Sequence, residues 1–178
     1  MSNHELRLRL AESSDLPLLR EVMSLAIEQL QSALGPEQVR ASHAIMGLDT
    51  QLVCDGTYFV AQAGEEIAGC GGWSRRATLF GGDHSHKLRE PRLVDPATEP
   101  ARVRAMYTHP RFVRCGVGRL ILAASEAAAK HEGFLRAELM STLSGERLYR
   151  SCGYVELERL AADVRGVDVP LIRMGKVL

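Results

Sequence analysis

The sequence predicts a single mixed α/β domain that covers residues 1–178. Segments with strand-like alternation and segments with helical spacing follow one another along the whole chain. Residues 102–109, 117–131 and 135–140 form a strand–helix–strand unit, which is typical of a right-handed parallel crossover. The composition, 46% hydrophobic and 25% charged over 178 residues, suits one globular domain with a full core.

The first part of the chain predicts three strands and two helices. Residues 5–10 alternate between polar and apolar side chains, as a strand does. Apolar residues at helical spacing follow over 17–34, and a weaker helix is expected over 36–46. Residues 57–63 and 66–73 predict two strands joined by a short glycine turn, which is a hairpin signal.

Residues 74–100 differ from the rest because they are rich in glycine, proline and charge and lack periodicity. A structureless segment of this length is usually functional or mobile. Two interpretations of this segment and Trp73 are open. They form a wall or lid of a substrate site, or the segment is an ordinary surface loop. Asp83, His84 and His86 lack the geometry of a catalytic zinc site, so no metal site is expected.

The second part of the chain predicts the crossover unit followed by a short helix and a hairpin. Pro110 stops the strand over 102–109, and the helix over 117–131 ends near Gly133. A short helix precedes Gly153, and two strands then close the chain as a hairpin. That hairpin is a candidate surface for a homodimer.

Charge and cysteine usage restrict the partners and the compartment. The 22 basic and 22 acidic residues cancel, so nothing indicates a nucleic acid or another polyanion as partner. No apolar run approaches the length of a membrane span, and the N-terminus has no signal-peptide core. The four cysteines are widely spaced, which favours a reduced, cytoplasmic protein. No membrane partner is expected, because no apolar run is long enough to span a bilayer.

The stretch HPRFVRCGVGRLIL, residues 109–122, places a glycine turn between a strand and a helix. The first amides of a helix lack intrahelical partners, and glycine lets an anion approach the backbone closely. Three nearby cations, Arg111, Arg114 and Arg119, suit phosphate oxygens. The pattern indicates a pyrophosphate cradle, against the alternative of a turn that merely needs glycine. GVGRLI lacks the third glycine of a dinucleotide fingerprint, and no GK[ST] follows.

Three separated motifs resemble the GNAT N-acetyltransferase superfamily. AMYTHPRFVRCGVGRLIL, residues 105–122, is similar to its acetyl-CoA-binding motif. LRLAESSDLPLL near the start resembles its first strand and helix, and LYRSCGY, residues 148–154, resembles its late tyrosine motif. The resemblance spans essentially the whole chain. It implies a central, mostly antiparallel mixed sheet, flanked by helices, in which one parallel strand pair splays apart.

The resemblance also implies which residues hold acetyl-CoA, the co-substrate. The backbone of Met106 and Thr108 would pair with the pantetheine arm. The expected residues around the pyrophosphate are Val113, Arg114, Gly116, Val117, Gly118 and Arg119. Four substitutions depart from the family pattern: Val113 replaces Gln or Arg, Arg114 replaces glycine, Cys115 replaces Lys or Arg, and Thr142 stands where an asparagine is frequent. These weaken arguments from side chains, but the Val113 backbone can still donate.

The implied chemistry is direct attack of an amine on the acetyl group, with no covalent enzyme intermediate. Tyr149 is the candidate general acid for the departing thiolate; the alternative is a packed aromatic residue. No base is evident: Glu138 is a candidate, but a surface glutamate is the favoured interpretation, and an ordered water chain is expected in place of a base. His109 is expected to be structural, and Cys115 to be a small filler beside the cofactor rather than an activated thiol.

The expected activity is acetyl transfer to an amine of a small molecule or peptide. A non-catalytic CoA-binding sensor or scaffold is the alternative, and a second alternative binds another pyrophosphate ligand at the same turn. The acceptor itself is not specified by the sequence, because loops of this family vary the acceptor pocket.

Overall fold

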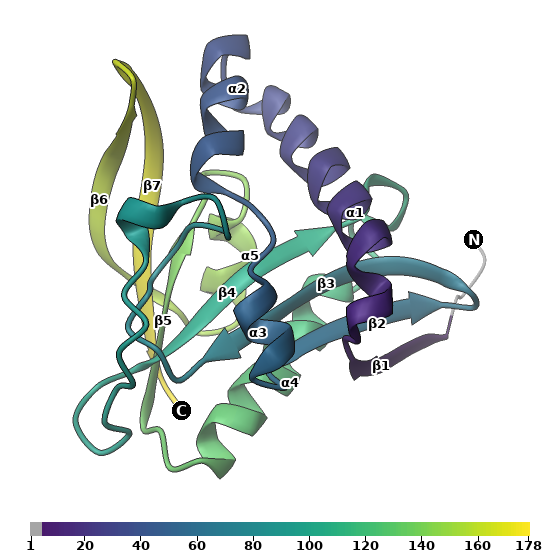
Figure 1. The fold of residues 1–178 in the computed structure, drawn as a ribbon, viewed down its shortest axis with the longest axis vertical. Helices are drawn as coiled ribbons and strands as arrows, with labels where there is room; N and C mark the ends of the chain where they lie inside the picture. The colour runs from purple at the N-terminus through teal and green to yellow at the C-terminus, as the bar shows by residue number, and fades with distance from the viewer. Residues whose placement is uncertain (1–4) are drawn as a thin grey trace.

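A computed structural model describes residues 5–178, and these form a seven-stranded sheet with helices on both faces (Figure 1). The sheet order is β1-β2-β3-β4-β5-β7-β6, and every neighbouring pair except β4–β5 is antiparallel. The strands are β1 Leu6–Leu10, β2 Tyr58–Ala63, β3 Glu66–Ser74, β4 Ala101–Thr108, β5 Arg136–Ser141, β6 Val155–Val164 and β7 Val167–Val177. The predicted mixed, mostly antiparallel fold is confirmed.

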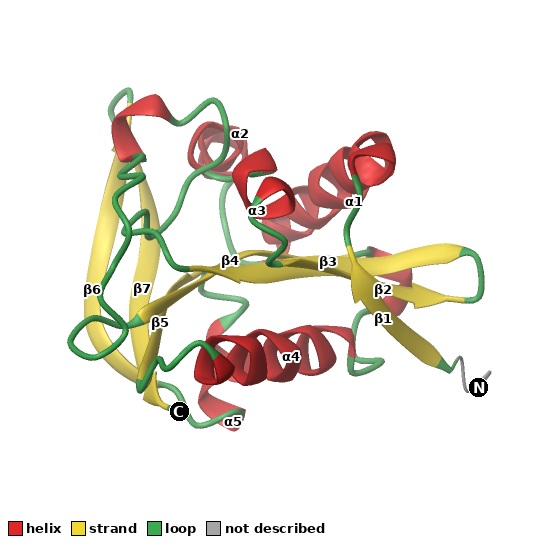
Figure 2. Cartoon of the chain, turned by 60° about the horizontal axis from the view of Figure 1, so that its bottom comes forward, coloured by secondary structure: helices red, strands yellow, loops and turns green. Residues whose placement is uncertain are grey.

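The helices divide between the two faces of the sheet, as Figure 2 shows. One face carries α1 Leu16–Glu28, α2 Pro36–Ile45 and α3 Thr50–Cys54, and the other carries α4 Val117–His131 and α5 Glu146–Ser151. The sequence predicts α1 as longer than it is, because its last turn tightens into a 3-10 helix at Gln29–Ser32. None of the described helices has the length and apolarity that crossing a bilayer requires.

The parallel pair β4–β5 separates soon after it begins. Backbone pairing joins Ala101 to Ala137 and Arg102 to Glu138, and it stops there. Beyond Arg102, β4 remains paired with β3, while β5 remains paired with β7 up to Ser141. The edge of β4 that faces β5 is therefore open over its remaining length. This is the predicted splay, and it makes a gap in the sheet that side chains from both faces can reach.

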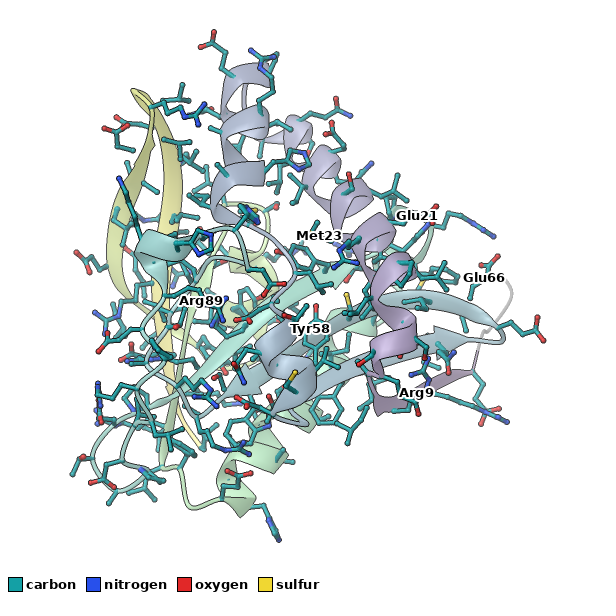
Figure 3. The ribbon with its side chains drawn as sticks, in the orientation of Figure 1. Arg9, Glu21, Met23, Tyr58, Glu66 and Arg89 are labelled. Carbon is teal, nitrogen blue, oxygen red and sulfur yellow. The ribbon has the colours of Figure 1, made fainter. Side chains whose placement is uncertain are left out.

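A β-bulge in β4 lies beside this gap. Gly72 pairs with Arg104 and Cys70 with Tyr107, so Ala105 and Met106 together face only Gly71. Ala105 adopts a left-handed φ of 50°, which is uncommon for a residue with a Cβ. The Tyr58 hydroxyl, near the centre of the sheet in Figure 3, donates to the Ala105 carbonyl at 2.8 Å. That bond fixes the bulge from strand β2, which lies beyond β3 in the sheet.

Residues 74–100 are held against the domain at several points. Arg76 and Leu93 form an isolated antiparallel bridge, and the Arg76 guanidinium also binds Asp55 at 2.7 Å. Of the two alternatives for Trp73, the substrate wall is wrong. Its side chain is 1% exposed and packs edge-on against Phe134, with ring centroids 5.7 Å apart. The reason is register: Trp73 lies in β3 opposite Val103, on the core side.

The buried face of α4 also differs from the predicted one. Val117 and Ile121 are buried as expected, but the face continues through Ser125 and Ala129. The sequence predicts one apolar helical face made of Val117, Leu120, Ile121, Ala124, Ala128 and His131, whereas His131 is exposed. The difference arises because alanines occur on several sides of this helix, so the apolar residues do not define one face clearly at 100° per residue.

Candidate active site

A cavity of about 750 Å³ occupies the gap between β4 and β5. All six residues from Val103 to Thr108 of β4 line it, opposite Leu139 and Met140 of β5. Further lining residues come from α4 and α5 on one face of the sheet and from the α1–α2 region on the other. The cavity therefore reaches both faces through the splay, and each end can be described separately.

The end next to α4 is built from backbone amides. Gly116 is the N-cap of α4 with a left-handed φ of 85°, a conformation that glycine adopts without strain. Leu120 makes the first backbone bond of the helix, to the Gly116 carbonyl at 3.0 Å. The preceding amides of Val117, Gly118 and Arg119 have no intrahelical acceptor and carry the positive end of the helix dipole.

Gly118 lies where α4 packs against Leu148 of α5. A Cβ at this position would lie 2.8 Å from Leu148 Cδ2 and 4.0 Å from Thr108 Oγ1. Glycine therefore lets the helix terminus pack against α5 while the cavity beside β4 stays open. The Val113 amide, in contrast, already donates to the Pro110 carbonyl at 3.4 Å, so it is less available to an anion than the sequence suggests.

Three arginines line this end of the cavity. Arg114 holds a left-handed φ of 68°, and the Arg119 guanidinium donates to Ser151 Oγ at 3.0 Å. Arg147 of α5 is the third, and sequence analysis missed it; its place two residues before Tyr149 was the available signal. Arg111 is different, because it binds Glu66 at 3.0 Å and does not line the cavity.

Tyr149 lines the cavity from α5. Its side chain is 8% exposed, and its ring packs edge-on against Tyr154 at 5.9 Å between centroids. Burial raises the pKa of the Tyr149 phenol above its usual value near 10, because the phenolate would lose hydration. The hydroxyl is therefore protonated at neutral pH and able to donate a hydrogen bond.

Glu138 is neither a lining residue nor an exposed surface residue. Its side chain is 13% exposed, and one carboxylate oxygen accepts from Arg102 at 2.8 Å and from Arg173 at 2.7 Å. Two arginines bind this carboxylate within the sheet, and it does not line the cavity. It was a candidate base because β5 was expected beside the site, but Glu138 lies opposite Arg102, in the short stretch where β4 and β5 are still paired and the gap has not yet opened.

The other reactive side chains noted in the sequence have structural contacts. His109 Nδ1 accepts from the Arg111 amide at 3.2 Å, which supports the short turn after β4. Cys115 is exposed and does not line the cavity, so it is no filler beside it. Asp83 accepts from the Thr50 amide at 3.0 Å, and a ring nitrogen of His84 contacts the His43 carbonyl at 2.8 Å. Among residues 5–178, no three His, Cys, Asp or Glu side chains converge.

The opposite end of the cavity, next to α1 and α2, is apolar. Its lining side chains are mainly aliphatic, methionine or aromatic: Ile27, Leu30, Ile45, Met46, Leu79, Phe80, Met140 and Leu171. The loop that contains Phe80 belongs to residues 74–100, so only a small part of that segment reaches the cavity. Gln29 and Ser32 contribute uncharged polar groups.

A buried ion pair supports this apolar end. Arg104 binds Asp49 at 2.9 Å, and both side chains are 2% exposed. The same guanidinium donates to the Gly81 carbonyl at 2.6 Å, and Arg89 donates to Asp49 at 3.2 Å. Asp49 also caps α3 by accepting from the Gln51 amide. The pair thus connects β4, α3 and the loop that contains Phe80, and sequence patterns gave no sign of it.

Comparisons with known proteins agree with this geometry. A sequence model of the acetyltransferase (GNAT) domain matches residues 54–156, which is more than half of the chain. A structure described as a GCN5-related N-acetyltransferase from Rhodopseudomonas palustris superposes with a TM-score of 0.70 at 19% identity, covering 97% of this chain and 95% of that one. No curated protein matches the chain in sequence.

Two other solved structures show the same fold. A ribosomal-protein-alanine N-acetyltransferase from Brucella melitensis has a TM-score of 0.66 at 19% identity, over 97% of this chain and 99% of that one. A PaiA N-acetyltransferase from Thermoplasma acidophilum, in complex with coenzyme A, has a TM-score of 0.64 at 14% identity, over 98% and 99%.

The fold and the two-ended cavity define an acyltransferase. The chain belongs to the GNAT acetyltransferase family, and acetyl-CoA is its co-substrate. Its cavity fits that molecule, because an open strand edge and a helix N-terminus with three arginines meet in one continuous space.

Proposed function

We propose that the protein is an N-acetyltransferase that transfers the acetyl group of acetyl-CoA to a primary amine of a small molecule or peptide by direct attack. The observation that carries the proposal is the single cavity that passes between β4 and β5 and is lined from both faces of the sheet. A donor entering from the α4 face and an acceptor entering from the α1–α2 face would meet at the splay.

The end next to α4 would hold acetyl-CoA. The backbone of Met106 and Thr108 lies on the open stretch of β4, where a pantetheine arm can add as a strand-like partner. The amides of Val117, Gly118 and Arg119 would bind the pyrophosphate, with Gly116 setting the turn and Arg114 adding charge. Val113 would contribute a packing contact rather than an amide donor, because its amide already donates to the Pro110 carbonyl. When bound, acetyl-CoA supplies an activated acetyl thioester.

Tyr149 would act as the general acid. Its buried hydroxyl is protonated at neutral pH, and it lines the cavity beside the splay. A thiol has a pKa of about 8.5, so a thiolate forming beside this phenol can be stabilised by its hydrogen bond. Any oxyanion developing on the acetyl group would need a donor from the open edge of β4, which has no strand partner beyond Arg102.

The names of two structural neighbours support an amine acceptor and a CoA donor. The Brucella melitensis protein is named as a ribosomal-protein-alanine N-acetyltransferase, and the Thermoplasma acidophilum structure contains coenzyme A. Both share the fold of this chain at low sequence identity, so they support the class of reaction and leave the acceptor to be found from this chain itself.

Thermal unfolding with and without acetyl-CoA tests the donor site. A ligand at about 100 times its Kd contributes about 2.7 kcal/mol of stability. For a chain of this length that raises Tm by roughly 5–11 °C. NAD and ATP serve as controls and are expected to do far less. An unchanged Tm at saturating acetyl-CoA would contradict the proposal, and acetyl-CoA-dependent thiol release in an amine screen then tests turnover.

A further inference from the structure

We propose that the acceptor is an apolar amine of low basicity, which reaches the site already uncharged and without charged groups on its body. The inference rests on the proposed N-acetyltransferase function and concerns the end of the same cavity that faces α1 and α2. Two observations support it: the charged side chains that line the cavity, and the partners that already bind the charged side chains nearby.

The cavity is lined by cations and contains no anion. Among the described residues 5–178, its lining includes four arginines and no Asp, Glu, His or Lys. The nearest buried carboxylate, Asp49, is held by Arg104, Arg89 and the Gln51 amide. An ammonium ion entering this space would meet no carboxylate to replace its water, so its desolvation would be uncompensated.

The titratable lining groups cannot serve as a base at neutral pH. These are the Cys70 thiol and the phenols of Tyr107 and Tyr149. Burial raises the pKa of Cys70 to about 12 and raises the pKa of both phenols above their usual range. The Tyr107 hydroxyl is also occupied, because it accepts from the Gly47 amide at 3.0 Å and donates to the Gly47 carbonyl at 3.2 Å.

The acceptor must therefore lose its proton to water before it attacks. At pH 7.5 an α-amine with a pKa near 7.8 is about one-third uncharged, whereas a lysine-type amine with a pKa near 10.4 is roughly 0.1% uncharged. A site without a base thus favours the weakly basic amine by more than about a hundredfold, before any contact with the rest of the molecule is counted.

The walls define the body that carries this amine. Ile45, Met46, Phe80 and Leu171 present hydrocarbon and thioether surface. Arg104 offers no free site for an acceptor carboxylate, because its guanidinium is bound by Asp49 and the Thr78 and Gly81 carbonyls. The walls therefore offer no free ionic partner to an anionic or cationic acceptor. An aliphatic or aromatic acceptor gains free energy because its apolar surface is buried.

Four amines separate the two parts of this proposal. Phenylalaninamide has a weakly basic amine on an apolar body, phenethylamine has the same ring with a strongly basic amine, glycinamide has the weak amine without the ring, and spermidine is a polycation. We expect kcat/KM at pH 7.5 to be highest for phenylalaninamide, at least about tenfold above glycinamide and more above phenethylamine and spermidine.

The pH dependence tests the missing base. We expect kcat/KM for phenethylamine to rise about tenfold per pH unit between pH 7 and 9, while that for phenylalaninamide levels off above about pH 8. Both curves would then follow the amines themselves. A shared plateau from a common, lower pKa would reveal a base in the protein and overturn the proposal.

A variant pair adds the missing charge. Met46→Glu places a carboxylate on the apolar wall, and Met46→Gln is the matched uncharged control. We expect the ratio of spermidine to phenylalaninamide turnover to be at least about tenfold higher in Met46→Glu than in Met46→Gln, provided that acetyl-CoA still raises Tm in both.

The possible failures are distinguishable. If spermidine is the best substrate of the wild type, the acceptor inference is overturned and the donor site stands. If acetyl-CoA binds but no amine is acetylated, the acceptor inference is overturned and so is the proposed transferase function, in favour of a non-catalytic CoA-binding domain. If acetyl-CoA neither binds nor loses its acetyl group, the proposed function itself fails.

Discussion

The two ends of the cavity are built from opposite kinds of surface. The end at α4 offers backbone amides, a glycine turn and arginines without buried partners, whereas the end at α1 and α2 offers hydrocarbon side chains around a fully paired arginine. A polyanion suits the first, and an uncharged body suits the second. The comparison teaches that an arginine's role depends on its neighbours: Arg114 is free to meet a ligand, while Arg104 is already neutralised by Asp49.

The largest expected effect is at the α4 end. Gly118→Glu places a carboxylate against the proposed phosphate site and pushes on Leu148, because any Cβ at position 118 would lie 2.8 Å from Leu148 Cδ2. We expect the acetyl-CoA-induced rise in Tm to disappear. Ala127→Glu, an exposed position on the same helix, is the control and should keep it. Unchanged acetyl-CoA affinity in folded Gly118→Glu would place the phosphate site elsewhere.

The next effect concerns the paired arginine. Asp49→Ala leaves Arg104 buried and uncompensated, so we expect the free energy of unfolding to fall by about 3–5 kcal/mol. Glu66 lies at the tip of the β2–β3 hairpin (Figure 3) and binds the exposed Arg111. Glu66→Ala removes this exposed ion pair, so the loss of unfolding free energy should stay below about 1 kcal/mol. Urea unfolding measures both. Equal losses would mean that Arg104 is not held in a low-dielectric interior.

Tyr149→Phe sharpens the comparison where the two ends meet. The ring and its packing remain, and only the donor is lost, so kcat should fall at least about tenfold with little change in acetyl-CoA affinity. Tyr154→Phe is the control, because Tyr154 packs against Tyr149 but does not line the cavity. Full turnover by folded Tyr149→Phe on its preferred amine would reduce this residue to a packing role.

The smallest expected effect tests a single exposed charge. Arg114→Asn keeps a residue that tolerates the left-handed backbone and removes the cation, so KM for acetyl-CoA should rise about two- to fivefold. Arg165→Asn makes the same change at φ 52° in the β6–β7 turn and should leave KM unaltered. A rise of equal size in both variants would indicate a general effect of net charge.

The elements that sequence analysis predicted well are those with long periodic patterns or a punctuated motif. The alternation in β1, the glycine turn before α4 and the closing hairpin each specify local structure strongly. By contrast, α3 was missed because five residues, Thr50–Cys54, are too few to show a period. The bulge at Ala105 was missed because it depends on a hydrogen bond from Tyr58, far away in the sequence.

The same distinction holds for the site. The α4 end could be predicted because its function lies in a contiguous stretch, residues 113–119, where glycine and arginine are adjacent in sequence. The apolar end could not, because it is assembled from separate segments and looks like ordinary core in each of them. The pairing of Arg104 with Asp49, and of Glu138 with Arg102 and Arg173, likewise depends on contacts that no local pattern contains.

The central claim is that donor and acceptor enter one cavity from opposite faces of the sheet. Amide hydrogen exchange with and without acetyl-CoA tests it directly. We expect acetyl-CoA alone to slow exchange over 103–108 and 114–120, and phenylalaninamide added to the CoA complex to slow exchange over 27–47 and 79–81. Protection by acetyl-CoA confined to the α1–α2 segments, with none at the start of α4, would contradict the account.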